Sequence, residues 1–198
     1  MTPSIELPER LHTIDTPDVL YRIHSTLFDA VYFGQQAAYR FDAPDGAFGV
    51  LYAAQHPFGA FVETCLRQRT GTHSPVIDRR SLKTKKLTTL YLGTTAAGTA
   101  ARSVELFGPG MARNWANGDV GASYEYEQSQ AYSAAVHAHP DHVAGIGYLC
   151  RHDNSQLAFA LYDRIANVIE EISTPDWTLD EDEDLLEELE DRYGLAII

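Results

Sequence analysis

Residues 39–67 constrain the fold of this chain more than any other segment, because they combine a turn, an apolar strand and the start of a helix. The run Asp42-Ala43-Pro44-Asp45-Gly46 predicts the turn, since proline presets φ and glycine supplies an unusual dihedral. The apolar run 48–54 lies between turn signals and is typical of an interior strand. Pro57 suits the first turn of a helix that continues through Leu66. The segment therefore predicts a turn, strand and helix within a mixed α/β chain.

Each of these three elements carries one polar side chain in apolar surroundings, namely Arg40, Tyr52 and Glu63. Arg22 joins them from the expected strand 19–24. Two guanidinium groups, a phenol and a carboxylate can bind an anionic ligand and stabilise a developing cation. Each residue also has a plainer interpretation, because arginines and a helical glutamate are common on surfaces and a tyrosine in an apolar strand is usually a core residue.

Further elements follow from patterning along the chain. Strands are expected over 87–92, 143–150 and 157–162, the last two as antiparallel partners. A helix is expected over 127–139, where Pro140 stops it. The aromatic segment 28–33 is expected to be buried.

The formal net charge of −13 is concentrated in one segment. Residues 170–198 hold twelve Asp and Glu against Arg192 alone, so the rest of the chain is nearly neutral. Leucines in this acidic segment fall near helical spacing. This pattern favours an amphipathic helix that packs on the domain, and it disfavours a free arm. The expected organisation is a lead-in over 1–19, a domain over 20–169 and an acidic tail over 170–198.

The composition also bounds the class of protein. A chain without a basic patch is not expected to bind nucleic acid directly. No apolar run is long enough for a membrane span, and residues 1–7 lack the pattern of a secretory signal. Cys65 and Cys150 are too few for a disulfide framework. A cytoplasmic protein is the expectation.

The order of several short motifs resembles the RES domain family, which is named for its arginine, glutamate and serine. The motifs of the first half are Tyr21-Arg22, Arg40-Phe41, Leu51-Tyr52 and Glu63. In the second half, Ser129-Gln130-Ala131 is followed by the runs 145–153 and 157–163, so that the resemblance covers about residues 20–164. It implies an α/β (α+β) fold similar to ADP-ribosyltransferases, with central mixed or antiparallel strands flanked by helices.

The resemblance also implies an activity. Family members consume NAD, cleaving the nicotinamide–ribose bond by phosphorolysis or hydrolysis, or transferring ADP-ribose to a protein. Many are toxins paired with an antitoxin that carries a helix-turn-helix (Xre-type) region. The implied catalytic residues are Glu63, Arg40 and Cys150, and the implied NAD-binding residues are Arg22, Arg40 and Tyr52. A homo-oligomer is compatible with the resemblance, and no metal is expected.

Position 150 departs from the family pattern, because Cys150 stands where the family has serine before arginine. A thiol is a weaker hydrogen-bonding group than a hydroxyl. Weakened catalysis is therefore one expectation, and a non-catalytic interaction protein built on the same fold is the alternative. A nucleophilic role for Cys150 is disfavoured, since no general base is securely placed beside it.

Three histidines, His137, His139 and His142, raise the question of a metal site. On a helix, two residues that are two positions apart diverge by about 200°, so His137 and His139 would not share a face. The three histidines are therefore interpreted as residues at the end of a helix and not as metal ligands.

Overall fold

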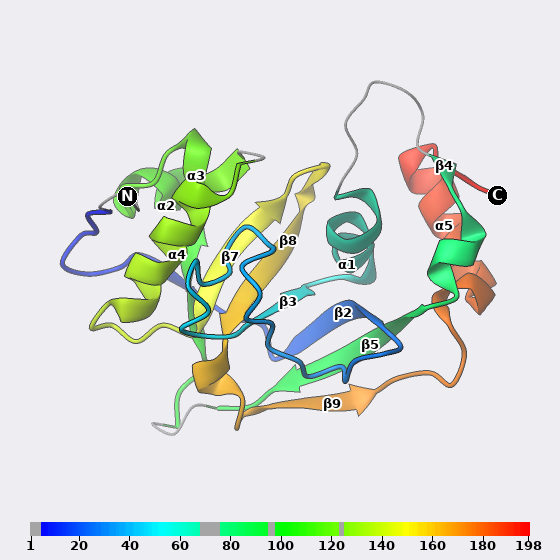
Figure 1. Ribbon diagram of the computed structural model, residues 1–198, viewed down its shortest axis with the longest axis horizontal. Coiled ribbons are helices and arrows are strands. Elements are labelled where there is room, and N and C mark those ends of the chain that lie inside the picture. Colours follow the sequence, from blue (N-terminus) through cyan, green and yellow to red (C-terminus); the bar gives the residue numbers. More distant parts are fainter. Residues whose placement is uncertain (1–4, 68–75, 95–97, 123–124) are drawn as a thin grey trace.

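The computed structural model describes residues 5–67, 76–94, 98–122 and 125–198 (Figure 1). Its centre is an eight-stranded sheet in the order β1-β6-β7-β8-β3-β2-β5-β9. The pair β6–β7 is parallel and the other neighbouring pairs are antiparallel. The strands are β1 (Thr13–Asp15), β2 (Val19–Ser25), β3 (Val50–Ala54), β5 (Lys85–Leu92), β6 (Arg102–Leu106), β7 (Gly145–Cys150), β8 (Asp153–Tyr162) and β9 (Ile169–Ser173).

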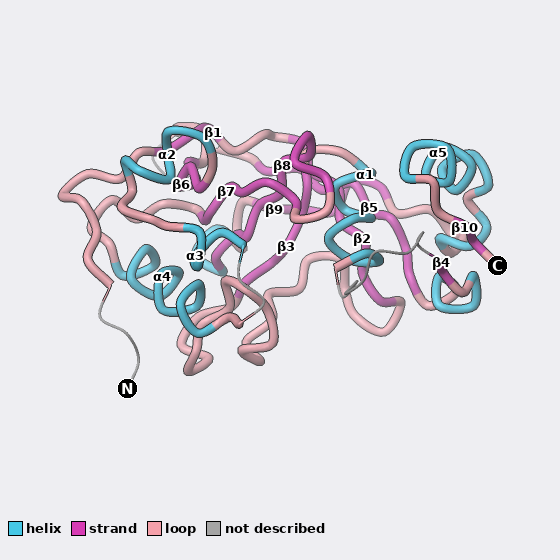
Figure 2. Tube along the Cα trace, turned by 90° about the horizontal axis from the view of Figure 1, so that it is seen from above, coloured by secondary structure: helices cyan, strands magenta, loops and turns pink. Residues whose placement is uncertain are grey.

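Helices flank this sheet at both ends and over its middle. They are α1 (Pro57–Phe61), α2 (Gly108–Arg113), α3 (Gly118–Ala122), α4 (Glu127–Ala138) and α5 (Glu183–Tyr193), with a π-helix Val62–Leu66 and 3₁₀ helices Arg79–Leu82, Asp163–Ile165 and Leu179–Glu181. Helices α2, α3 and α4 gather at one end of the molecule, and α5 lies at the other beside β4 (Val76–Ile77) and β10 (Ala196–Ile197) (Figures 1 and 2). This arrangement confirms the expected mixed α/β class. Among the described helices, none has the length and apolarity that a bilayer span requires.

The central strands form where the sequence predicts them. Strand β3 lies between β8 and β2, and it is covered on both faces: Val50 and Ala54 belong to one apolar cluster, and Leu51 and Ala53 to the other. Burial on both faces explains why the run 48–54 is apolar without alternation. Strands β7 and β8 form the expected antiparallel hairpin, with its turn at Arg151-His152.

The expectation that segment 28–33 is buried is wrong for two of its three aromatic rings. Phe28 is 52% exposed and Tyr32 is 38% exposed, and the rings stack on each other with centroids 5.1 Å apart. Both side chains border the cavity described below. Aromatic composition alone does not separate a core segment from the wall of a pocket, which is why the sequence was misleading here.

The predicted boundary between residues 169 and 170 does not coincide with a break in the sheet. Strand β9 begins at Ile169 and pairs with β5 along the sheet edge. At the other end of the chain, β1 lies inside the expected lead-in and pairs with β6. Beyond β9, α5 buries Leu186 and Leu189 in the apolar cluster that also contains Phe61.

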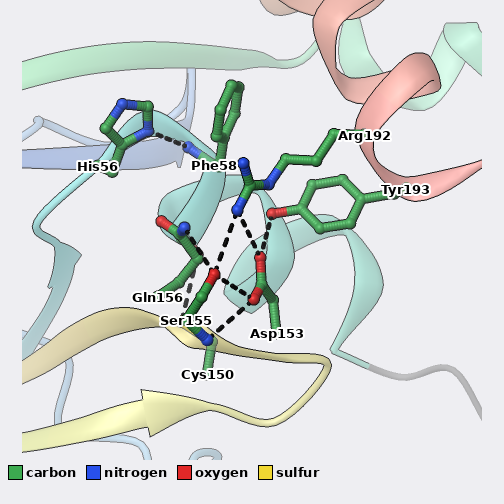
Figure 3. Close-up of polar contacts among 9 residues, drawn as sticks. His56, Phe58, Cys150, Asp153, Ser155, Gln156, Arg192 and Tyr193 are labelled. Carbon is green, nitrogen blue, oxygen red and sulfur yellow. Dashed lines mark hydrogen bonds and ion pairs between the residues drawn. The ribbon is translucent and has the colours of Figure 1, made fainter.

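Helix α5 is also held by polar contacts, which Figure 3 shows. The Tyr193 hydroxyl donates a hydrogen bond of 2.9 Å to Asp153 Oδ2, and Arg192 lies 3.4 Å from the same oxygen. The Arg192 guanidinium carbon lies 4.9 Å from the centre of the Phe58 ring, on α1. The end of α5 therefore contacts both α1 and the start of β8.

Candidate active site

The turn before β3 is organised around the buried carboxylate of Asp42. Its Oδ2 accepts hydrogen bonds of 3.0 Å from the backbone N–H groups of Ala38 and Tyr39. Its Oδ1 accepts a hydrogen bond of 2.9 Å from the hydroxyl of Tyr52 on β3. Burial raises the pKa of Asp42, and these hydrogen bonds oppose that rise. Asp42 thus joins the turn to the strand, a role that the sequence did not reveal.

The Arg40 side chain leaves this turn and is fixed on several sides. It is 6% exposed, and its Nη1 donates a hydrogen bond of 3.0 Å to the Gly121 carbonyl in α3. The guanidinium carbon lies 5.4 Å from the centre of the Tyr148 ring and 5.7 Å from that of Phe41. A cation over aromatic rings is stabilised by their negative faces. Arg40 is therefore an ordered positive charge.

Arg22 lies on β2, and its Nη1 donates a hydrogen bond of 3.1 Å to the Tyr32 carbonyl. Burial lowers the pKa of Arg22 to about 10, while the nearby phenols of Tyr39 and Tyr32 oppose the fall. The side chain therefore remains charged at neutral pH.

The Tyr52 hydroxyl is engaged within the protein. It donates to Asp42 and accepts a hydrogen bond of 2.9 Å from the backbone N–H of Phe41. Burial raises the pKa of Tyr52 well above its ordinary value, and the carboxylate of Asp42 adds to the rise. Its proton is committed to Asp42, so the part of Tyr52 that is available to a ligand is its ring.

Glu63 lies on the π-helix Val62–Leu66, which directly continues α1. Short π-helical segments occur frequently at functional sites. The Glu63 Oε2 accepts a hydrogen bond of 3.1 Å from the Tyr148 hydroxyl, and its Oε1 accepts one of 3.3 Å from the backbone N–H of Arg151. Both donors come from the end of β7 and the turn after it.

One cavity of about 340 Å³ is lined by all four of these residues, namely Arg22, Arg40, Tyr52 and Glu63. This volume lies in the range of small-molecule sites, roughly 300–1,000 Å³. Tyrosine and phenylalanine rings form much of the wall. The charged lining residues are Arg22, Arg40, Asp42, Glu63, Arg67 and Lys85. The structure thus brings together four of the five residues expected to form the site, and a cavity with cations, a carboxylate and aromatic rings can bind an anion with a planar ring.

Sequence reasoning missed Arg67, Lys85 and Tyr148. Arg67 follows the π-helix, and its guanidinium carbon lies 4.2 Å from the centre of the Tyr39 ring. Lys85 begins β5, and Tyr148 lies in the run 145–153, which the sequence did not mark as part of the site. One signal was present for Arg67, which lies four residues after Glu63, about one helical turn.

Cys150 lies beside the cavity but is not among the residues that line it. It is fully buried, and its Sγ is 3.8 Å from the Gly59 carbonyl of α1. Burial raises the pKa of the thiol, and the carboxylate of Glu63 raises it further. A protonated thiol is a poor nucleophile. The expected involvement of Cys150 in catalysis would therefore act through its contacts with α1 and with the Glu63 carboxylate, and it stays a prediction.

The three histidines near the end of α4 have separate environments. The His137 ring stacks on Phe48 with centroids 4.0 Å apart, whereas the His139 Nε2 lies 3.1 Å from the Pro8 carbonyl. His142 is exposed. Within the described ranges, no group of three or more His, Cys, Asp or Glu side chains is arranged as a metal site would require.

Comparison with known proteins gives one match. A family model described as RES domain matches residues 19–182, which is most of the chain. No curated protein and no solved structure shows a significant match.

Proposed function

The chain belongs to the RES domain family, and on this premise we propose that it cleaves NAD between nicotinamide and ribose. The observation that carries the proposal is the carboxylate of Glu63 in a cavity that also holds the guanidinium groups of Arg22 and Arg40.

The reaction breaks the bond between the ribose C1 and the nicotinamide nitrogen. The bonding electron pair leaves with nicotinamide, whose ring becomes neutral, and the ribose carbon acquires oxocarbenium character. A carboxylate beside that carbon stabilises the positive charge where it develops. Water or phosphate then adds to C1 and gives ADP-ribose or its 1-phosphate. Glu63 is the residue that we assign to this stabilisation.

Arg22 and Arg40 are assigned to the diphosphate. Each donates one N–H group to a backbone carbonyl, which orients the planar guanidinium. A guanidinium carries five N–H donors in a fork that matches phosphate oxygens, so the same side chain can also bind an anion. The Tyr52 ring, whose hydroxyl is held by Asp42, is assigned to stacking on the nicotinamide or the ribose.

We also assign a toxin role to the chain, with an antitoxin that carries a helix-turn-helix (Xre-type) region as its partner. The partly exposed rings of Phe28, Tyr32 and Tyr39 line the cavity, and Leu27, the neighbour of Phe28 in sequence, is 83% exposed. Such a group of apolar side chains favours a protein that covers the site. Expression of the chain alone should arrest growth, and co-expression of the partner should restore it.

The decisive experiment measures nicotinamide release from NAD by the purified chain, with and without phosphate. Wild-type protein should release nicotinamide, and dependence on phosphate would identify phosphorolysis. Glu63→Gln should lower the rate by at least about 10², the effect typical of a group that stabilises charge in the transition state. Glu187→Gln, an exposed substitution on α5, is the matched control and should leave the rate unchanged.

Three results would contradict the proposal or redirect it. Unchanged turnover in Glu63→Gln would remove Glu63 from the site. A folded wild-type chain that releases no nicotinamide would favour the non-catalytic alternative. Transfer of labelled ADP-ribose to a protein, in place of free products, would identify an ADP-ribosyltransferase.

A further inference from the structure

Tyr148 occupies the wall of the cavity on β7. It is 3% exposed, and it lies on the same face of the strand as Ile146 and Cys150. Its ring packs on Phe41 with centroids 5.0 Å apart. The ring is therefore fixed by packing, and its hydroxyl has a defined direction.

The Tyr148 hydroxyl points toward Glu63. The Tyr148 hydroxyl donates a hydrogen bond of 3.1 Å to Glu63 Oε2, across 85 residues of sequence. Burial raises the pKa of Tyr148 well above its ordinary value, and the Glu63 carboxylate raises it further. The hydroxyl thus keeps its proton and remains a donor throughout the physiological pH range.

The second oxygen of Glu63 is held from the same side, by the backbone N–H of Arg151. A glutamate has three side-chain torsions, and freezing such a side chain costs up to roughly 1.5–2 kcal/mol of conformational entropy. These two donors, together with the Cys150 thiol that also hydrogen-bonds Glu63, hold the carboxylate in one orientation before any substrate arrives. Orientation of this kind contributes to rate, since a displacement of about 1 Å can cost a factor of about 10².

We propose that Tyr148 is a positioning residue, which acts through Glu63 by fixing the orientation of its carboxylate in the cavity. The inference rests on the proposed function of Glu63. Tyr148 transfers no proton and forms no bond to the substrate, so its contribution is a hydrogen bond that is present before and after the reaction.

Other buried tyrosines provide a comparison. The Tyr132 hydroxyl donates a hydrogen bond of 3.0 Å to the Asn114 carbonyl, and Tyr132 is as well buried as Tyr148 but does not line the cavity. Replacing either tyrosine by phenylalanine removes one buried hydroxyl and one hydrogen bond. Tyr132→Phe is therefore a matched control for the cost to stability.

The experiment compares kcat and KM for NAD in the wild type, Tyr148→Phe and Tyr132→Phe, with thermal unfolding of each. Tyr148→Phe should lower kcat about 10–100-fold and change KM less than about twofold, because the binding residues remain in place. Tyr132→Phe should lower Tm by a similar amount and leave kcat within about twofold of the wild type.

A second pair of variants tests whether Tyr148 acts through Glu63. Glu63→Asp withdraws the carboxylate by one methylene, which should take it out of hydrogen-bond reach of the Tyr148 hydroxyl. Adding Tyr148→Phe to Glu63→Asp should therefore lower kcat by less than about twofold.

The outcomes separate this inference from the proposed function. A wild type that cleaves NAD, with Tyr148→Phe no slower than Tyr132→Phe, would overturn the positioning role alone. An equal loss of kcat in the wild-type and Glu63→Asp backgrounds would also overturn it. A folded wild type that does not cleave NAD would overturn both.

Discussion

At the scale of single residues, the side chains of the site are fixed by hydrogen bonds to other buried polar groups. Asp42 contacts the N–H groups of the turn and the hydroxyl of Tyr52, so one carboxylate fixes the segment from which Arg40 extends and the ring that faces the cavity. Glu63 is held in turn by Tyr148. A buried group that loses its partner typically costs about 1–3 kcal/mol, which makes such pairs sensitive to substitution.

Position 150 gives a prediction at this scale. The side chain does not line the cavity, and it contacts the Gly59 carbonyl and the Glu63 carboxylate. Because a serine hydroxyl can keep both contacts, Cys150→Ser should change kcat and KM less than about threefold. A hydroxyl forms a stronger hydrogen bond to a carbonyl than a thiol does, so stability should change by less than about 1 kcal/mol. Steady-state kinetics and thermal unfolding measure both effects.

Cys65→Ser is the control, because it makes the same thiol-to-hydroxyl change at the other free cysteine. A gain of tenfold or more in turnover for Cys150→Ser alone would contradict the prediction. It would show that the thiol limits catalysis despite its burial.

At the scale of elements, the hairpin β7–β8 connects the site to the end of the chain. Its β7 strand supplies Tyr148, and its turn supplies the N–H group that contacts Glu63. The first residue of β8, Asp153, accepts the hydrogen bond from Tyr193 on α5. The acidic helix is therefore a support of the hairpin, which its charge alone did not indicate.

Tyr193→Phe tests this support. Removing the hydroxyl should lower the free energy of unfolding by about 1 kcal/mol, which for a chain of this size lowers Tm by about 2–4 °C. Thermal unfolding measures the change. Glu188→Gln, an exposed substitution on the same helix, should leave Tm within about 1 °C. Equal Tm values for both variants would show that the contact contributes nothing to stability.

At the scale of the whole molecule, local patterns predicted the central elements and the pairing of β7 with β8, but not the rest of the assembly. The strands around Leu20, Leu51 and Leu161 and the helix ending near Pro140 were predicted, because each is marked by apolar runs and turn residues over short distances. The short edge strand at Thr13 could not be predicted, since it depends on pairing with a distant strand. A similar reason explains why Tyr148 was missed: its role follows from the packing of β7 near the π-helix that carries Glu63, which no local pattern indicates.

A chain that ends at residue 169 tests whether the predicted tail is separable. This truncation removes Leu179, Leu186, Leu189 and Leu195 from the core. At about 1.5–3 kcal/mol for each buried leucine, the loss of about 6–12 kcal/mol matches the whole stability of a typical domain. The truncated chain should show no cooperative unfolding transition by calorimetry.

The control keeps the helix and reduces its charge. Glu187→Gln combined with Glu188→Gln changes two exposed side chains and should unfold cooperatively, as the wild type does. A truncated chain that still unfolds cooperatively would show that the tail over 170–198 is separable from the domain, as the sequence predicted.

The docking of α5 on the hairpin has a consequence for the order of folding during synthesis. The leucines of α5 that pack in the core and the tyrosine that contacts Asp153 come after the hairpin in the sequence. A growing chain in which α5 has not yet emerged from the ribosome lacks these contacts. The hairpin that holds Glu63 therefore gains its full support only after α5 has been made.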